Sequence, residues 1–204
     1  MYRVIKIDIL LKYTAYFTVV LSMGIYSLVR WLWLPSFELY KVVGISSIIS
    51  AATIFVLSAN FFSRKIWALC TYFKKDLFPD LNGTWHGKII TEDKDEIEVR
   101  AVIRHSLLLT QIDMHGETMK SITLETTPII DAGQKKLYYL YRSTPKNPSW
   151  HSYNGCTLFD LREIENNGEK VIEMTGHYYT DRKSVGRISI QQIGPDPHND
   201  VSFY

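Results

Sequence analysis

The hydropathy pattern of this chain changes at residues 80–91, "DLNGTWHGKIIT". Before this stretch lie two long apolar runs without a charged residue, at 13–29 and 42–62. After it, apolar and polar residues alternate with the period of two that is typical of half-buried β-strands. The sequence therefore predicts two helices followed by an all-β domain within its 204 residues.

The two apolar runs have the length of transmembrane helices. About 20 apolar residues with a rise of about 1.5 Å each cross a hydrocarbon core of about 30 Å. The second run meets this length, and the first meets it if residues 31–34, "WLWL", extend it. A cleaved signal peptide is the alternative for the first run, but no small-residue cleavage site follows it. We expect residues 1–65 to form a transmembrane hairpin.

Basic residues on either side of the apolar runs predict the orientation of this hairpin. Three Lys and Arg residues lie in 1–12 and four in 64–75, whereas the connection contains only Arg30 and Lys41. Short cytoplasmic segments carry the excess of Lys and Arg. This count places the N-terminus and the β domain in the cytoplasm.

Eight segments with strand periodicity follow the hairpin, separated by turn signals such as "ENNG". Consecutive strands without intervening helices predict an antiparallel sheet, and closure of the sheet into a barrel removes its exposed edges. We expect an eight-stranded antiparallel minimal β-barrel, lipocalin-like in outline, over residues 82–194, between a juxtamembrane linker at 66–81 and a polar tail at 195–204. The expected strands are 83–91, 95–104, 106–114, 117–127, 136–143, 154–163, 170–180 and 185–193.

The "GTW" tripeptide is a frequent opening of small barrels that hold a ligand. Trp85 lies between Gly83 and Gly87, and its indole can close one end of such a barrel. The alternative is an ordinary strand with a core tryptophan.

Charge and motif content restrict the function. Residues 76–204 contain fourteen Lys and Arg against nineteen Asp and Glu, and this acidic balance argues against a binder of nucleic-acid polymers. The six histidines show no metal-ligand spacing, and the two cysteines are Cys70 and Cys156. There is no GxSxG, P-loop or glycine-rich dinucleotide fingerprint. We expect neither an enzyme nor a metal site nor a cofactor.

Two apolar helices, "LNGTWHGKI" at 81–89 and "GHYYTDRKSVGRISIQQIGP" at 176–195 together resemble one family. It comprises the membrane-anchored β-barrel effectors of bacterial CBASS antiphage systems, the two-helix cyclic-nucleotide receptors associated with CD-NTases. The resemblance implies a two-span inner-membrane protein whose cytoplasmic barrel binds a cyclic dinucleotide. Binding would promote self-association, and the clustered helices would disrupt the lipid bilayer and kill the cell.

A cyclic dinucleotide presents flat bases and phosphates, which bind aromatic faces and cationic or hydroxyl groups, respectively. Segments 136–155 and 176–190 combine tyrosines with Arg, Lys and hydroxyl residues. The alternative is that these tyrosines only pack in strands and that "TDRK" is a solvated turn. The predicted ligand-binding residues are Tyr141, Arg142, Tyr178, Thr180, Arg182 and Arg187.

Two other functions are compatible with the same pattern. The first is a membrane-tethered, lipocalin-like carrier of a small apolar ligand, which would need an apolar lumen. The second is a passive module whose barrel docks a partner protein.

Overall fold

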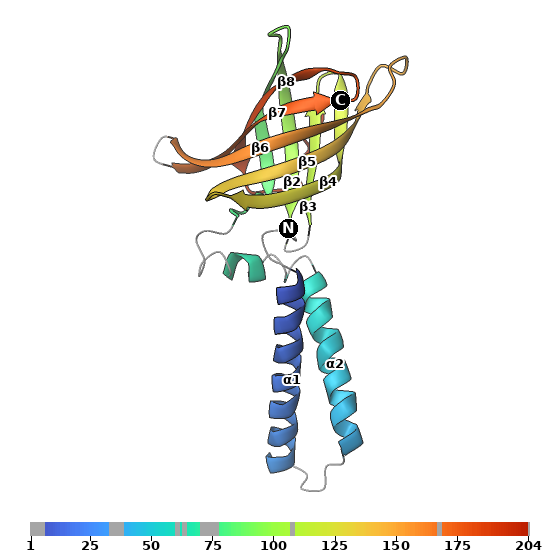
Figure 1. Ribbon diagram of the computed structural model, residues 1–204, viewed down its shortest axis with the longest axis vertical. Coiled ribbons are helices and arrows are strands. Elements are labelled where there is room, and N and C mark those ends of the chain that lie inside the picture. The colour runs from blue at the N-terminus through green and yellow to red at the C-terminus, as the bar shows by residue number, and fades with distance from the viewer. Residues whose placement is uncertain are drawn as a thin grey trace.

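The structure is a computed structural model, and it describes residues 7–32, 39–59, 62, 65–69, 78–106, 109–166 and 169–203. A helical pair lies at one end of the long axis and a β-barrel at the other (Figure 1). Over the described residues the elements are α1 (Ile7–Leu32), α2 (Leu39–Ser58), β1 (Gly83–Thr91), β2 (Glu96–His105), β3 (Thr110–Gly116), β4 (Met119–Asp131), β5 (Gln134–Pro145), β6 (Tyr153–Asn166), β7 (Glu169–Thr180) and β8 (Val185–Gly194).

The eight strands form a closed antiparallel barrel in sequence order, and β1 pairs with β8. The predicted eight-stranded antiparallel barrel is therefore confirmed. Most strands begin or end within a few residues of the expected bounds. The largest difference is the β4–β5 hairpin, which is longer because Ala132 and Gly133, with φ of 47° and 80°, form a tight turn between Asp131 and Gln134.

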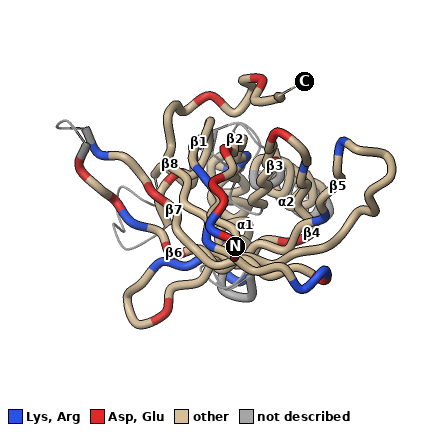
Figure 2. Tube along the Cα trace, turned by 90° about the horizontal axis from the view of Figure 1, so that it is seen from above, with Lys and Arg blue, Asp and Glu red and all other residues tan. Residues whose placement is uncertain are grey.

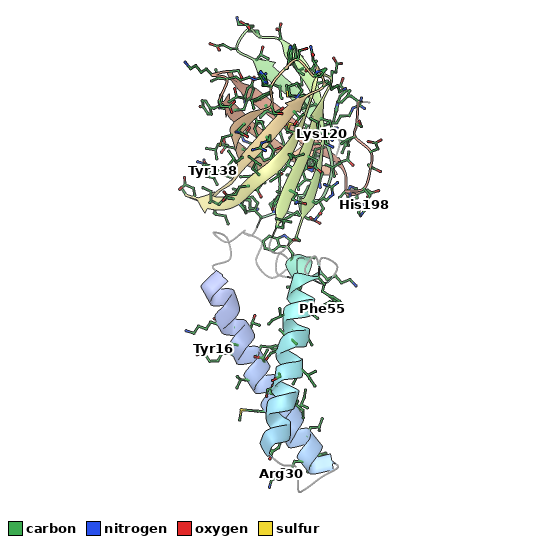
Figure 3. The ribbon with its side chains drawn as sticks, turned by 90° about the vertical axis from the view of Figure 1, so that its right-hand side faces the viewer. Tyr16, Arg30, Phe55, Lys120, Tyr138 and His198 are labelled. Atoms are coloured by element: carbon green, nitrogen blue, oxygen red, sulfur yellow. The ribbon has the colours of Figure 1, made fainter. Side chains whose placement is uncertain are left out.

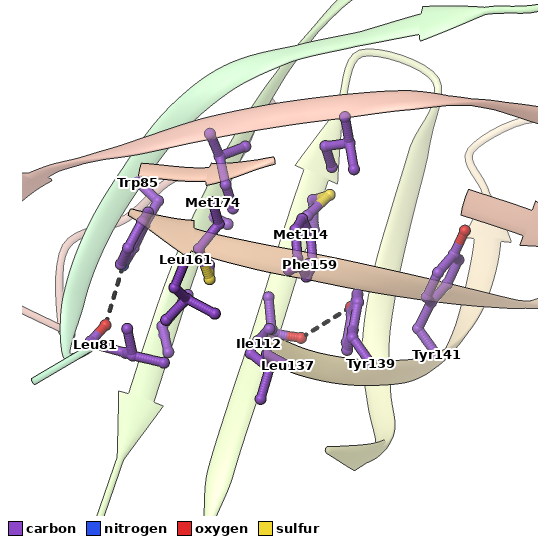
Figure 4. Close-up of a cluster of buried hydrophobic side chains, with 14 of the residues drawn as sticks. Leu81, Trp85, Ile112, Met114, Leu137, Tyr139, Tyr141, Phe159, Leu161 and Met174 are labelled. Carbon is purple, nitrogen blue, oxygen red and sulfur yellow. Dashed lines mark hydrogen bonds between the residues drawn. The ribbon is translucent and has the colours of Figure 1, made fainter. Parts of the chain in front are cut away.

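Trp85, near the start of β1, is buried in the core of the barrel. Its side chain has no exposed surface, and its indole Nε1 donates a hydrogen bond to the carbonyl of Leu81 at 3.0 Å (Figure 4). A Cβ at Gly87 would lie 1.9 Å from the carbonyl oxygen of Ser189. The glycine therefore permits β1 to approach β8 closely enough to close the sheet. The full burial of Trp85 agrees both with a plug at one end and with an ordinary core tryptophan.

The prediction of two N-terminal transmembrane helices is wrong. Among the helices in the described ranges, none combines the length and the apolar character needed to cross a bilayer. The prediction rested on the length of the two runs and on the absence of charged residues within them, although both runs also contain hydroxyl side chains. Ser22 and Thr53, for example, donate hydrogen bonds to backbone carbonyls of their own helices at 2.6 and 2.8 Å. The localisation as a two-span inner-membrane protein with a cytoplasmic N-terminus and barrel is contradicted by the same finding.

Candidate functional site

The interior of the barrel contains a cavity of about 320 Å³ near the end opposite Trp85. This volume falls within the range of about 300–1,000 Å³ for small-molecule sites. Ile89, Val99 and Ile188 form part of an apolar wall. Among the described residues that line the cavity, none is Lys or Arg.

Four tyrosines, Tyr139, Tyr141, Tyr153 and Tyr178, line this cavity. Tyr139 and Tyr141 alternate along β5 and therefore point to the same face of the sheet. Their rings stack with centroids 4.9 Å apart, and the hydroxyl of Tyr139 donates to the carbonyl of Ile112 at 3.2 Å (Figure 4). The cavity thus offers flat aromatic surfaces to a ligand.

The hydroxyls of Tyr139, Tyr141 and Tyr178 remain protonated at neutral pH, because the pKa of each is raised. Burial, reinforced by the neighbouring phenols, raises the pKa of Tyr139 and Tyr141. Burial also raises the pKa of Tyr178, with smaller contributions from Tyr153 and the Glu92 carboxylate. The phenols of Tyr141 and Tyr178 can therefore act as hydrogen-bond donors inside the barrel, whereas the Tyr139 hydroxyl already donates to Ile112.

Two adjacent turns form part of the mouth of the cavity. The turn between β1 and β2 carries Glu92, Asp93 and Asp95, all of which line the cavity. The turn between β7 and β8 contains Arg182 and Lys183. Because β1 pairs with β8, the acidic and basic turns are neighbours. Figure 2 looks down on this end of the barrel and shows acidic and basic positions around it.

Arg182 is held at the mouth by contacts with the segment that leads into β6. Its guanidinium carbon lies 4.3 Å from the centroid of the Tyr153 ring, and its Nη2 donates a hydrogen bond to the carbonyl of His151. The cation is therefore positioned over one of the cavity tyrosines without entering the lumen.

The structure brings three of the predicted ligand-binding residues to the cavity wall: Tyr141, Tyr178 and Thr180. Arg182 lies at the mouth. Arg142 and Arg187 do not face the cavity, because each alternates with an inward-facing neighbour, Tyr141 and Ile188 respectively. Arg142 lies on the outer surface, where its Nε donates to the Asn154 Oδ1 at 3.3 Å.

Several lining residues were missed by the prediction. Tyr139 shares a strand face with Tyr141 but was not included among the predicted ligand-binding residues. Glu92, Asp93 and Asp95 lie at the connection between the first two expected strands, where the sequence predicted no ligand contact. Their place at the mouth depends on the register between β1 and β8, for which the local sequence has no signal. In the part of the chain that the structure describes, no group of three or more His, Cys, Asp or Glu residues could hold a metal ion.

Comparison with known protein families gives one match. A family model described as "Cap15, cyclic dinucleotide receptor domain" matches residues 77–192, which is more than half of the chain. The match begins just before β1 and ends within β8, so it includes every segment that lines the cavity. No curated protein matches the chain.

Proposed function

Because the chain belongs to the Cap15 cyclic dinucleotide receptor family, we propose that its cavity binds a cyclic dinucleotide second messenger in CBASS antiphage defence. The proposed role is ligand sensing without catalysis. The observation that carries it is the tyrosine-lined cavity within the matched segment, open between an acidic and a basic turn.

The distribution of charge supports a specific orientation of the ligand. With no Lys or Arg among the described lining residues, the interior cannot neutralise a phosphate. Arg182 and Lys183 at the mouth can do so by charge-assisted hydrogen bonds. We infer that the phosphates stay at the mouth and that a base enters the cavity. The volume of about 320 Å³, near the lower end for ligand sites, suits such partial insertion.

Inside the cavity, stacking on tyrosine rings would supply the affinity for a base. Base–aromatic stacking contributes about 1–3 kcal/mol per base in single-strand binders. The Glu92, Asp93 and Asp95 carboxylates repel phosphate but accept hydrogen bonds from the amino groups of adenine, guanine or cytosine. The acidic turn would thus favour base edges on its side of the mouth and phosphates on the side of Arg182.

Self-association is the proposed output of ligand binding. The helical pair α1–α2 and the barrel belong to one chain, so a ligand that brings barrels together also brings helical pairs together. Membrane disruption is not part of this proposal, because the transmembrane helices on which it depended are contradicted.

Isothermal titration of the full chain with a panel of cyclic dinucleotides tests the proposal. At least one member should bind, while the linear dinucleotide with the same bases should bind much more weakly because its ends are not preorganised. Light scattering on the same samples should show an increase in molar mass with ligand. Absence of binding to every member would remove the proposed function.

The apolar wall of the cavity supports a second candidate function, that of a carrier of a small apolar molecule. Ile89, Val99 and Ile188 would contact such a molecule. An apolar fluorescent probe that binds in the cavity and is not displaced by any cyclic dinucleotide would favour the carrier.

A further inference from the structure

The segment that follows β8, residues 195–203, lies against the outside of the barrel. The Thr84 hydroxyl donates a hydrogen bond to the carbonyl of Asp196 at 2.9 Å and accepts one from the side-chain amide of Asn199 at 3.2 Å. His198 is exposed, and Figure 3 shows it on the outside of the barrel. Figure 2 shows the segment on the outer side of β1, β2 and β3. We call residues 195–203 the strap.

Side chains beneath the strap are buried although they point away from the lumen. Val102 on β2 and His115 on β3 alternate with inward-facing neighbours, so they face outward. They are nevertheless only 3% and 9% exposed, and Val201 of the strap is 6% exposed. Val102 pairs with Thr84, which the strap contacts. Burial lowers the pKa of the His115 imidazole, and the nearby Asp200 carboxylate of the strap opposes this shift. The strap therefore covers the outer face of β2 and β3.

The far end of the strap reaches the mouth of the cavity. The Arg100 guanidinium carbon lies 4.2 Å from the centroid of the Phe203 ring. The Lys146 Nζ donates a hydrogen bond to the Phe203 carbonyl at 3.5 Å. Lys146 directly follows β5, and its backbone nitrogen donates to the carbonyl of Thr118 at 2.9 Å. Thr118 is the neighbour of Met119, which lines the cavity. Phe203 is thus connected to the cavity wall through Lys146.

The wall at this position is the seam between β3 and β4. Along their described residues these two strands pair at only two positions, Met114 with Ser121 and His115 with Lys120, whereas β2 and β3 pair at seven. His115, in one of the two pairs, lies beneath the strap. The seam residues that line the cavity are Met114, Gly116, Met119 and Ser121. The strap therefore supports the cavity wall from outside at the seam with the fewest backbone pairs.

We propose that the strap positions the β3–β4 wall of the cavity and that Phe203 is a positioning residue for the ligand. The inference rests on the proposed function for the identity of the ligand, but not for the contact between strap and wall. The strap lies outside residues 77–192, which match the receptor domain, so that match assigns no role to it. A wall that is held in place before binding costs the ligand less ordering, so the strap raises affinity.

Hydrogen exchange of the ligand-free full chain tests the contact. The reporter is the backbone amide of Lys146, which donates to Thr118. F203A removes the ring beneath the Arg100 guanidinium, and we expect the reporter amide to exchange about tenfold faster. F203W keeps an aromatic ring and should restore the wild-type rate. H198A, at an exposed position of the strap, is the matched control and should leave the rate unchanged.

The amides of β6 distinguish positioning from a general loss of stability. β6 pairs with β5 and β7 and not with the strands beneath the strap. Its amides should exchange at the wild-type rate in F203A. Equal acceleration of the β6 amides, or an unchanged rate at Lys146, would overturn the inference.

Ligand affinity tests the second half of the inference. The same variants are titrated with a cyclic dinucleotide that the wild type binds. F203A should bind about three- to tenfold more weakly, whereas F203W and H198A should bind like the wild type. Equal affinities of F203A and the wild type would overturn the role of Phe203 in positioning the ligand. If no cyclic dinucleotide binds to the wild type, the proposed function is refuted, and the exchange rates decide whether the strap holds the wall.

Discussion

The ring of Tyr141 lies directly against Gly155, its cross-strand neighbour on β6. A Cβ at position 155 would lie 2.3 Å from Cζ of Tyr141 and 2.4 Å from its hydroxyl oxygen. Tyr178 has the same relationship with Gly186 on β8, where a Cβ would lie 2.6 Å from its Cε1. The width of the cavity therefore depends on two glycines as well as on the tyrosines that they accommodate.

G155A should narrow the cavity. The three atoms nearest to the added methyl group all belong to the Tyr141 side chain, so the ring must move toward the lumen. We expect affinity for the cyclic dinucleotide to fall about tenfold, which corresponds to about 1.4 kcal/mol. Titration calorimetry measures the affinity. G194A is the matched control, because nothing lies within 4 Å of the added atom. Equal affinities of the two variants would contradict the prediction.

Tyr178 should contribute stacking energy to ligand binding. Y178A removes the ring, and we expect affinity to fall by about 1–3 kcal/mol, or about 5- to 150-fold. Y178F keeps the ring and loses only the hydroxyl, so most of the affinity should remain. If both variants bind equally weakly, the hydroxyl carries the contact and stacking is refuted.

The two arginines that the sequence grouped together should behave differently. R182A removes the cation at the mouth, so affinity should decrease about three- to tenfold at low salt, and the dependence of affinity on salt should become weaker. R187A changes the outer surface and should leave both quantities unchanged. A stronger effect of R187A than of R182A would contradict the proposed orientation of the phosphates.

Asn82 fixes the start of β1 to the end of β2. Its side-chain amide donates to the carbonyl of His105 at 2.7 Å and accepts from the His105 backbone nitrogen at 2.8 Å. N82A leaves these buried backbone groups without partners, so we expect the free energy of unfolding to fall by about 2–4 kcal/mol. Urea denaturation measures the change. N154A, at an exposed position on β6, should change the free energy by less than about 0.5 kcal/mol.

Asp80 should make stability depend on pH in the acid range. Burial opposes ionisation of its carboxyl, but hydrogen bonds from His105 and Asn82 outweigh it and lower the pKa from 3.8 to about 2. The unfolded state thus binds a proton at higher pH than the folded state. The stabilisation is complete above pH 3.8 and is lost as pH falls toward about 2. D80N should lose less stability than wild type over this interval in urea denaturation. An identical pH dependence of the two proteins would contradict the assigned pKa.

The sequence predicted the barrel because its period-two pattern and turn residues are local signals. The position of Trp85 between two glycines at the start of a strand suggested a buried side chain, and this side chain has no exposed surface. Arg142 and Arg187 were assigned to the ligand by proximity in sequence to Tyr141 and Tyr178. In a strand, however, adjacent residues face opposite sides. The acidic turn at the mouth was not recognised, because its position depends on the pairing of β1 with β8 across more than ninety residues.

Methionine methyl NMR tests the central claim, that the ligand binds inside the barrel, most directly. Of the five methionines, Met114 and Met119 line the cavity, whereas Met174 is fully buried outside its lining and Met23 lies in α1. The full chain is titrated with a cyclic dinucleotide that binds. The methyl resonances of Met114 and Met119 should shift, and the dissociation constant fitted to these shifts should equal the one from calorimetry. The resonance of Met174 should move little. Saturating ligand that leaves Met114 and Met119 unchanged would place the ligand elsewhere and contradict the account.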